Sequence, residues 1–157
     1  QVARRWLNLR MRGKQYTIIA RHLKPAKGFS PVNIPTLSIA RGKDWLFHGN
    51  QRNVKFKILK TLRDKETGYR VPLVISLKGK LSKKRSFHIK IQRIKRYQRL
   101  DVLAHLHGFL RFFVKKLITN PYLFRSKVKA TLSIFEGTRL VEKHNIPGLA
   151  ESVFLNH

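Results

Sequence analysis

The chain has 157 residues, of which 35 are lysine or arginine and only 7 are aspartate or glutamate, so its formal net charge is +28. This excess excludes a self-neutralised surface, because the acids are spread singly or in one close pair. A compact domain this basic is most stable when a polyanion neutralises it, and nucleic acid is the commonest such partner. The absence of cysteine excludes a disulfide scaffold and thiolate zinc sites.

The apolar content predicts one folded domain. Hydrophobic residues make up 42% of the chain and aromatic residues 10%, which is enough to bury a core. No apolar run reaches the roughly 18 to 20 residues of a membrane span, so we expect a soluble protein without a membrane partner. The chain begins with Gln1 rather than Met, and a removed organellar transit peptide would explain that start.

The first third of the chain gives weak signals for regular structure. Residues 2–20 mix apolar and basic side chains, and we expect them to run along RNA as part of a basic extension that covers residues 1–27. Several prolines and a glycine in residues 24–35 predict a loop.

The next segments alternate between expected strands and loops. Residues 37–40 predict a short strand, and residues 42–53 predict another loop. In residues 54–62 the alternation of apolar residues favours a strand, while a second spacing suits a helix, so both remain open.

Two later segments have clear strand patterns. After a polar turn at residues 64–68, the run at residues 71–77 predicts a buried strand that ends at residues 78–80. Residues 127–135 alternate between apolar and polar side chains and predict a half-buried strand.

A basic run lies between these strands. Eight of the seventeen residues from 83 to 99 are lysine or arginine. Phe87, Ile89 and Ile91 share one face of a predicted strand, so the basic side chains turn to the other face. We expect the apolar face to hold the fold and the basic face to meet phosphate. Four residues of the run should therefore be dispensable for folding: Lys90, Arg93, Lys95 and Arg96.

Residues 100–118 predict an amphipathic helix, because apolar residues recur at three- and four-residue intervals. Its core positions are Leu103, Leu106, Leu110 and Phe113, which we expect to pack on the strands at 71–77 and 128–134. The predicted fold class is therefore α+β: a single RNA-binding domain over residues 28–157, with an antiparallel or mixed sheet packed on one main amphipathic helix and with basic extensions.

Four segments occur in an order that is typical of a known family. Residues 68–80 carry a glycine, an aliphatic run, a serine and a Leu-basic-Gly-basic ending, and residues 28–39 carry a Gly-aromatic pair that leads to an aliphatic-Pro step. These two segments resemble strands of the universal large-subunit ribosomal protein L-five family. Residues 108–118 are similar to the helix of that family, and residues 130–136 are similar to its later strand.

The resemblance implies a structural constituent of the large ribosomal subunit, placed in the central protuberance with ribosomal RNA and neighbouring ribosomal proteins as partners. The segment between helix and later strand is shortened to residues 119–127. Such departures, with the apolar-rich basic composition, are more typical of a mitochondrial ribosome, which is the expected location. The alternatives are a DNA-binding architectural protein and a metal-dependent nuclease.

The predicted RNA-binding residues are basic side chains from the N-terminal extension, the loops and the basic run. They are Arg4, Arg5, Arg10, Arg12, Lys14, Lys27, Arg41, Lys43, Lys78, Lys80, Lys83, Lys84, Arg85, Lys90, Arg93, Lys95, Arg96 and Arg99.

The sequence contains few residue patterns that are typical of catalytic sites. A two-metal nuclease needs clustered carboxylates, and the only close pair, Asp64 and Glu66, lies in a predicted turn. His105 and His107 are two apart on the predicted helix and face different ways, while His144 and the following Asn are only a fragment of a His-Asn-His motif. We therefore expect no enzyme, no catalytic residue, no metal, no cofactor and no small-molecule substrate.

Aromatic residues in the predicted loop at 42–53 have two possible roles. Gly42 and Gly49 flank Trp45, Phe47 and His48, which could stack on exposed bases. Anchoring in the core is the favoured interpretation.

Overall fold

The structure of the chain is a computed structural model that describes residues 3–25, 34–95, 97–104, 108, 112 and 121–155. Within these residues the structure forms ten strands, and Gly108 and Phe112 are helical. In chain order they are β1 Ala3–Arg12, β2 Tyr16–Pro25, β3 Ile34–Arg41, β4 Asp44–Asn50, β5 Val54–Arg63, β6 Arg70–Lys80, β7 Arg85–Arg93, β8 Gln98–Asp101, β9 Tyr122–Glu136 and β10 Arg139–Phe154.

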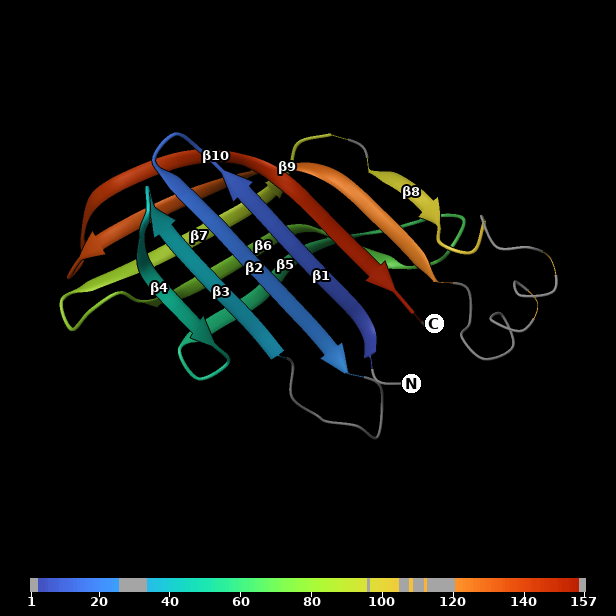
Figure 1. Cartoon of the computed structure of the whole chain (residues 1–157), viewed down its shortest axis with the longest axis horizontal. Coiled ribbons are helices and arrows are strands. Elements are labelled where there is room, and N and C mark those ends of the chain that lie inside the picture. The colour runs from blue at the N-terminus through green and yellow to red at the C-terminus, as the bar shows by residue number, and fades with distance from the viewer. Residues whose placement is uncertain are drawn as a thin grey trace.

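All ten strands belong to one antiparallel sheet. Their order is β4-β3-β2-β1-β10-β9-β7-β6-β5, and the short β8 pairs with the start of β9. The sheet curls into a half-barrel in which β1 to β4 cross in front of β5 to β7, while the long β9 and β10 curve over the top (Figure 1). The curl brings its two edges together, because β3 contacts β5 and the rings of His22 on β2 and Phe56 on β5 stack with centroids 4.1 Å apart.

The core fills the inside of the curl. Along each strand, alternate side chains point inward, as the two-residue period of a strand requires. On β7, Phe87, Ile89 and Ile91 are buried, and they lie opposite Ile134, Leu132 and Ala130 of β9. The buried cluster draws residues from β1, β2, β3, β5, β6, β7, β9 and β10. The half-barrel is therefore held by side chains of its own strands.

Gly148 allows β10 to lie close to β1. A Cβ atom at this position would come within 2.4 Å of the carbonyl oxygen of Arg10 and 2.5 Å of Cγ of Met11. Any larger residue would push the two strands apart at the point where β10 crosses from one layer to the other.

The predicted α+β fold is wrong. Leu100 and Asp101, at the start of the predicted helix, are in β8 and pair with Leu123 and Tyr122. Most of the remaining predicted helix, including Leu106, Leu110 and Phe113, lies outside the described residues. The strands take the place that was expected for a helix, because the sheet curls and covers its own apolar face.

Three segments with strand patterns in the sequence are strands in the structure. The strand at 71–77 lies in β6, that at 127–135 lies in β9, and residues 54–62 are a strand, β5. The expected loop at 42–53 instead contains β4. Residues 3–25, expected as a basic extension, form β1 and β2 in the middle of the sheet, and apolar residues of both strands are fully buried.

Candidate functional site: a lysine-rich outer face

The outer face of the β5-β6-β7-β9-β10 part of the sheet carries three rows of side chains that lie opposite one another across the strands. The first row is Lys55, Lys78, His88, Ser133 and Lys143. The second row is Lys57, Ser76, Lys90, Thr131 and Asn145. The third row is Lys60, Val74, Gln92, Lys129 and Pro147. We call these fifteen positions the lysine face.

The lysine face is a strongly uncompensated positive surface. It holds seven exposed lysines and no carboxylate. None of the seven takes part in an ion pair in the part of the chain that the structure describes. Lys55 lies directly opposite Lys78, and like charges in that position destabilise a sheet. Folding alone does not explain this arrangement.

Neutral side chains between the lysines are tied to one another. Oγ of Ser76 and Nε2 of His88 are hydrogen-bonded at 2.9 Å, and Oγ1 of Thr131 donates to Oδ1 of Asn145 at 3.0 Å. Burial, and then the charges of Lys78 and Lys90, lower the pKa of His88 below its usual value. Burial and the neighbouring lysines thus disfavour the charged form of His88, and the positive charge of the face comes mainly from its lysines.

A groove of about 820 Å³ lies at one end of the lysine face. The β4–β5 turn, β5, β6 and β7 line it, with Phe135 of β9 as a further wall. Four cationic side chains border the groove, namely Arg52, Lys55, Lys78 and Lys80. No carboxylate is among the lining residues.

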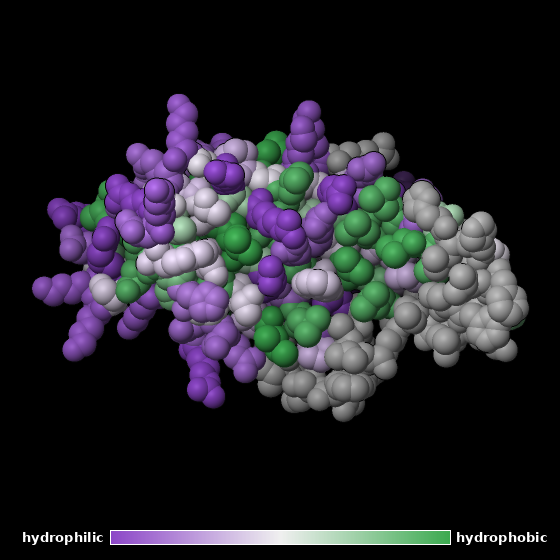
Figure 2. Space-filling model, viewed as in Figure 1, coloured by the Kyte–Doolittle hydropathy of each residue, from purple (hydrophilic) through white to green (hydrophobic). Residues whose placement is uncertain are grey.

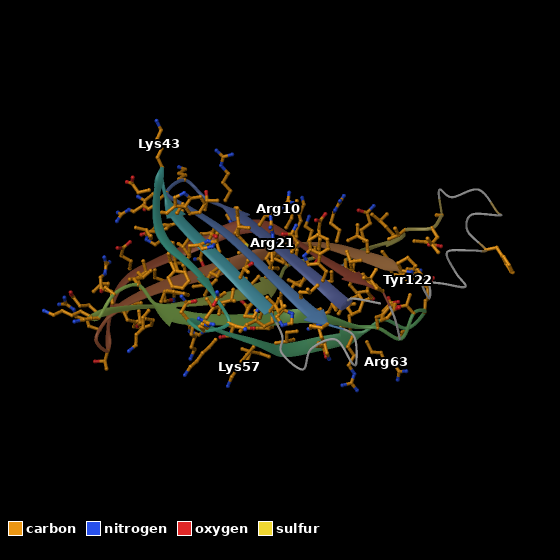
Figure 3. The ribbon with its side chains drawn as sticks, turned by 60° about the horizontal axis from the view of Figure 1, so that its bottom comes forward. Arg10, Arg21, Lys43, Lys57, Arg63 and Tyr122 are labelled. Atoms are coloured by element: carbon orange, nitrogen blue, oxygen red, sulfur yellow. The ribbon has the colours of Figure 1, made fainter. Side chains whose placement is uncertain are left out.

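The opposite layer has a different surface. An apolar row runs across its outer side, formed by Ile34, Leu23, Trp6, Val153, Leu123 and Leu100. Figure 2 views this layer and shows hydrophobic residues gathered over its middle. The neighbouring row contains an ion pair, in which Nη2 of Arg125 lies 2.8 Å from Oε1 of Glu151. Figure 3 shows that Lys57 and Arg63 leave the molecule on the side away from Lys43.

A second polar cluster joins β2 to β10. The hydroxyl of Tyr16 donates to Oε2 of Glu142 at 2.6 Å, and Nε2 of His144 lies 3.2 Å from the same oxygen. Arg85 and Arg41 approach the other oxygen of Glu142, at 3.2 Å and 3.9 Å. The hydrogen bond from Tyr16 is the main cause that lowers the pKa of Glu142, while burial, followed by that same bond, raises the pKa of Tyr16 to about 12. A groove of about 720 Å³ lies beside Tyr16 and His144.

The close acid pair in the β5–β6 turn has a structural role. The buried carboxylate of Asp64 accepts hydrogen bonds from the backbone and hydroxyl of Thr67, and from the hydroxyl of Tyr97. Arg99 pairs with both Asp64 and Glu66. Burial raises the pKa of Asp64, but its hydrogen bonds and Arg99 outweigh burial and lower that pKa to about 2. A carboxylate held in this way does not serve as a general base, and the described residues contain no group of side chains suited to a metal ion.

The structure scatters the basic residues that were predicted as one RNA-binding set. Lys78 and Lys90 lie on the lysine face, and Lys80 borders its groove. Seven further exposed residues lie on the other layer, in turns or after β7: Arg10, Arg12, Lys14, Lys43, Lys83, Lys84 and Lys95. Lys27 and Arg96 lie outside the described residues, as does the side chain of Arg4.

The remaining predicted residues bind other parts of the chain or are partly buried. Arg41 and Arg85 bind Glu142, Arg99 binds the acid pair, and Arg5 is partly buried. Arg93 donates to the carbonyl oxygen of Pro72 at 2.9 Å and to Oγ of Ser126 at 3.1 Å. It links β7 to β6 and β9, so the expectation that it is dispensable for folding is not supported.

Sequence reasoning missed five lysines of the face, which are Lys55, Lys57, Lys60, Lys129 and Lys143. The alternation in residues 54–58 was the available signal for two of them, because a strand there places its lysines opposite its apolar residues. The aromatic residues of β4 differ in burial. Phe47 packs on the core cluster and contacts Phe87 edge-on, whereas Trp45 is 66% exposed.

The fold is similar to several solved structures. A protein from Nitrosomonas europaea assigned as AttH is 13% identical, with a TM-score of 0.66 over 99% of this chain and 40% of that one. Kievitone hydratase from Nectria haematococca is 17% identical, with a TM-score of 0.56 over 97% of this chain and 40% of that one. CghA is 12% identical, with a TM-score of 0.58 over 99% of this chain and 42% of that one.

The chain thus spans about two-fifths of the length of these proteins. At such low identity the likeness shows the fold alone. One of the three is named as a hydratase, so the fold occurs in an enzyme, and the expectation that this chain is not an enzyme gains no support from the fold. No curated protein sequence matches the chain.

These comparisons overturn the ribosomal interpretation. The resemblance to the L-five family, the role in the large subunit, the ribosomal RNA and protein partners and the mitochondrial ribosome are all wrong. The DNA-binding and nuclease alternatives are not supported either. The Leu-basic-Gly-basic segment misled because it is a regular part of a strand. Lys78, Gly79 and Lys80 continue β6 and pair with His88, Phe87 and Ser86 of β7.

A family model for the Svf1 family matches residues 1–155, almost the whole chain. The chain belongs to the Svf1 family.

Proposed function

We propose that this chain is a peripheral membrane-binding domain whose lysine face docks on bilayers that carry anionic lipids. The observation that carries the proposal is the set of seven exposed lysines, without a carboxylate, on one side of the sheet. Each basic residue near an anionic bilayer surface contributes about 1 kcal/mol. Seven such contacts hold a domain on a membrane without a membrane span, and no helix in the described part of the chain is long and apolar enough to form one.

The chemistry of the face favours a lipid surface over nucleic acid. Proteins that bind single strands stack bases on aromatic side chains, and the fifteen positions of the lysine face hold no Phe, Tyr or Trp. Its cations are all lysines, which act as flexible point charges and lack the planar fork with which arginine reads a base edge. A surface of mobile headgroups needs only such charges.

Vesicle binding tests the proposal. The wild-type chain should bind vesicles that contain phosphatidylserine and should not bind vesicles of phosphatidylcholine alone. Replacement of Lys57, Lys60, Lys90 and Lys129 by Gln should raise the dissociation constant by roughly 100-fold or more, since each lysine contributes about 1 kcal/mol.

The control variant removes the same charge elsewhere. Its four replaced residues are exposed and lie outside the face: Arg12, Lys14, Arg21 and Lys43, each changed to Gln. We expect this variant to lose only a few-fold in affinity. Equal losses in the two variants would overturn the proposal, because binding would then follow net charge and not the lysine face.

A catalytic role is the second candidate, favoured by the cluster of Tyr16, Glu142 and His144. A carboxylate that accepts from a histidine ring nitrogen fixes the ring for proton transfer, and a groove of about 720 Å³ adjoins this pair. The similar structure of a hydratase supports the idea. Incubation with kievitone, followed by mass spectrometry for the addition of one water, would test it. Product that forms equally with His144→Gln, or no product at all, would count against catalysis at this site.

A further inference from the structure

We propose that the groove at the end of the lysine face binds a multiply phosphorylated lipid headgroup, such as a phosphoinositide. This inference rests on the proposed membrane function and gives it selectivity. The lysine face alone distinguishes charged from neutral bilayers, whereas a shaped cationic groove distinguishes one anionic lipid from another.

The groove gathers cations from three separate elements. Arg52 comes from the β4–β5 turn, Lys55 from β5, and Lys78 and Lys80 from β6. No ion pair within the described residues involves any of these four side chains. Four unpaired cations around one hollow match the several negative charges of a headgroup with two or three phosphates better than the single charge of phosphatidylserine.

The size and walls of the groove fit a cyclic polyol and not a lone phosphate. Its volume of about 820 Å³ lies in the usual range for small-molecule sites, roughly 300 to 1,000 Å³. Three phenylalanines, Phe47, Phe87 and Phe135, supply apolar walls, and Ser86 and Asn53 supply polar groups. Gly79 allows the Phe87 ring to lie directly against the β6 backbone, since a Cβ atom at Gly79 would lie 2.6 Å from Cζ of that ring.

The position of the groove argues for a lipid as the source of the phosphates. Lys55 and Lys78 belong both to the groove and to the first row of the lysine face. A headgroup in the groove would therefore remain attached to a lipid in the bilayer on which the face docks. The direct opposition of Lys55 and Lys78 costs stability in the free protein, and a phosphate between them would remove that repulsion.

Charge-matched vesicles provide the test. One set contains phosphatidylserine, and the other contains phosphatidylinositol bisphosphate at the same total negative charge. The wild-type chain should bind the second set about tenfold more tightly, which corresponds to about 1.4 kcal/mol. The double variant Arg52→Gln, Lys80→Gln should lose this preference and bind the two vesicle sets with equal affinity, because the preference comes from the groove.

The outcomes separate the two proposals. Equal wild-type binding to both vesicle sets, or a preference that survives in the double variant, overturns the headgroup site and leaves membrane docking intact. Binding to neither set overturns membrane docking and, with it, the lipid source. If the chain binds neither vesicle set but the groove takes a free anion, soluble inositol trisphosphate should still bind to the wild-type chain. That binding should be weaker in the double variant, which lacks the cations of Arg52 and Lys80. A melting temperature close to that of wild type establishes that the double variant is folded.

Discussion

The hydroxyl of Tyr16 donates a hydrogen bond to Oε2 of Glu142 across 126 residues of sequence, at 2.6 Å. This contact ties β2 to the start of β10, and the same carboxylate also receives His144 and Arg85. It is a point at which the curl of the sheet is fixed by polar groups instead of apolar ones.

Tyr16→Phe should therefore destabilise the fold without leaving a cavity. A hydrogen bond to a charged group contributes about 1.5 to 3 kcal/mol, and we expect the lower end of this range because Glu142 keeps its other partners. Chemical denaturation measures the loss. Arg139→Gln is the control, since among the described residues the Arg139 side chain forms a single, exposed ion pair, with Glu136. If the two variants are equally stable, the Tyr16 bond is not important for the curl.

The buried carboxylate of Asp64 should make stability depend on acid pH. Its pKa in the folded chain is about 2, below the usual value of 3.8 for an aspartate side chain. A group with a lowered folded pKa contributes stability that is complete above its unfolded pKa and is lost as the pH falls toward its folded pKa. We expect a loss of about 2 kcal/mol between pH of about 4 and about 2. Asp64→Asn should be less stable at pH 7 and should show a smaller loss over that range, and an unchanged acid profile would contradict the assignment.

Buried strand residues, and not the expected helix, form the main core. Leu132 is fully buried between its neighbours on β7 and β10, so Leu132→Ala should cost about 2 to 5 kcal/mol of unfolding free energy. Leu59→Ala is the matched control, because Leu59 is 57% exposed on β5 and should change stability by less than about 0.5 kcal/mol. Urea unfolding of both variants measures the difference, and similar costs would mean that the interior is loosely packed.

His88 should report on the charge around it. Burial is the largest cause that lowers its pKa, and Lys78 and Lys90 add to it. Replacement of both lysines by Gln should raise the pKa toward its usual value, and so should a phosphorylated headgroup bound in the adjoining groove. Nuclear magnetic resonance titration of the ring protons follows the change. A pKa that does not respond to inositol trisphosphate in the wild-type chain would indicate that the anion binds elsewhere.

The sequence by itself determined the properties that depend on neighbours along the chain. The apolar run at residues 71–77 and the alternation in residues 87–91 and 127–135 predicted strands that the structure contains, because both patterns are local properties of a strand. The charge of +28 was interpreted as the mark of a ribosomal RNA partner, and the family match overturns that interpretation. The apolar spacing after Leu100 predicted a helix, yet Leu100 and Asp101 pair with β9 instead. A short stretch cannot reveal which distant strand will compete for its backbone hydrogen bonds.

Only the tertiary structure decided the candidate site. Lys57, Lys90 and Asn145 lie in one row because of the register of β5, β6, β7, β9 and β10, which joins residues far apart in the sequence. Lys90 and Arg93 lie three residues apart on β7, so they point to opposite sides of the sheet. The side chain of Arg93 binds Pro72 and Ser126. A basic run in a sequence gives its amount of charge, but pairing between strands decides which charges share a face, since a shift of one residue sends a side chain to the opposite side of the sheet.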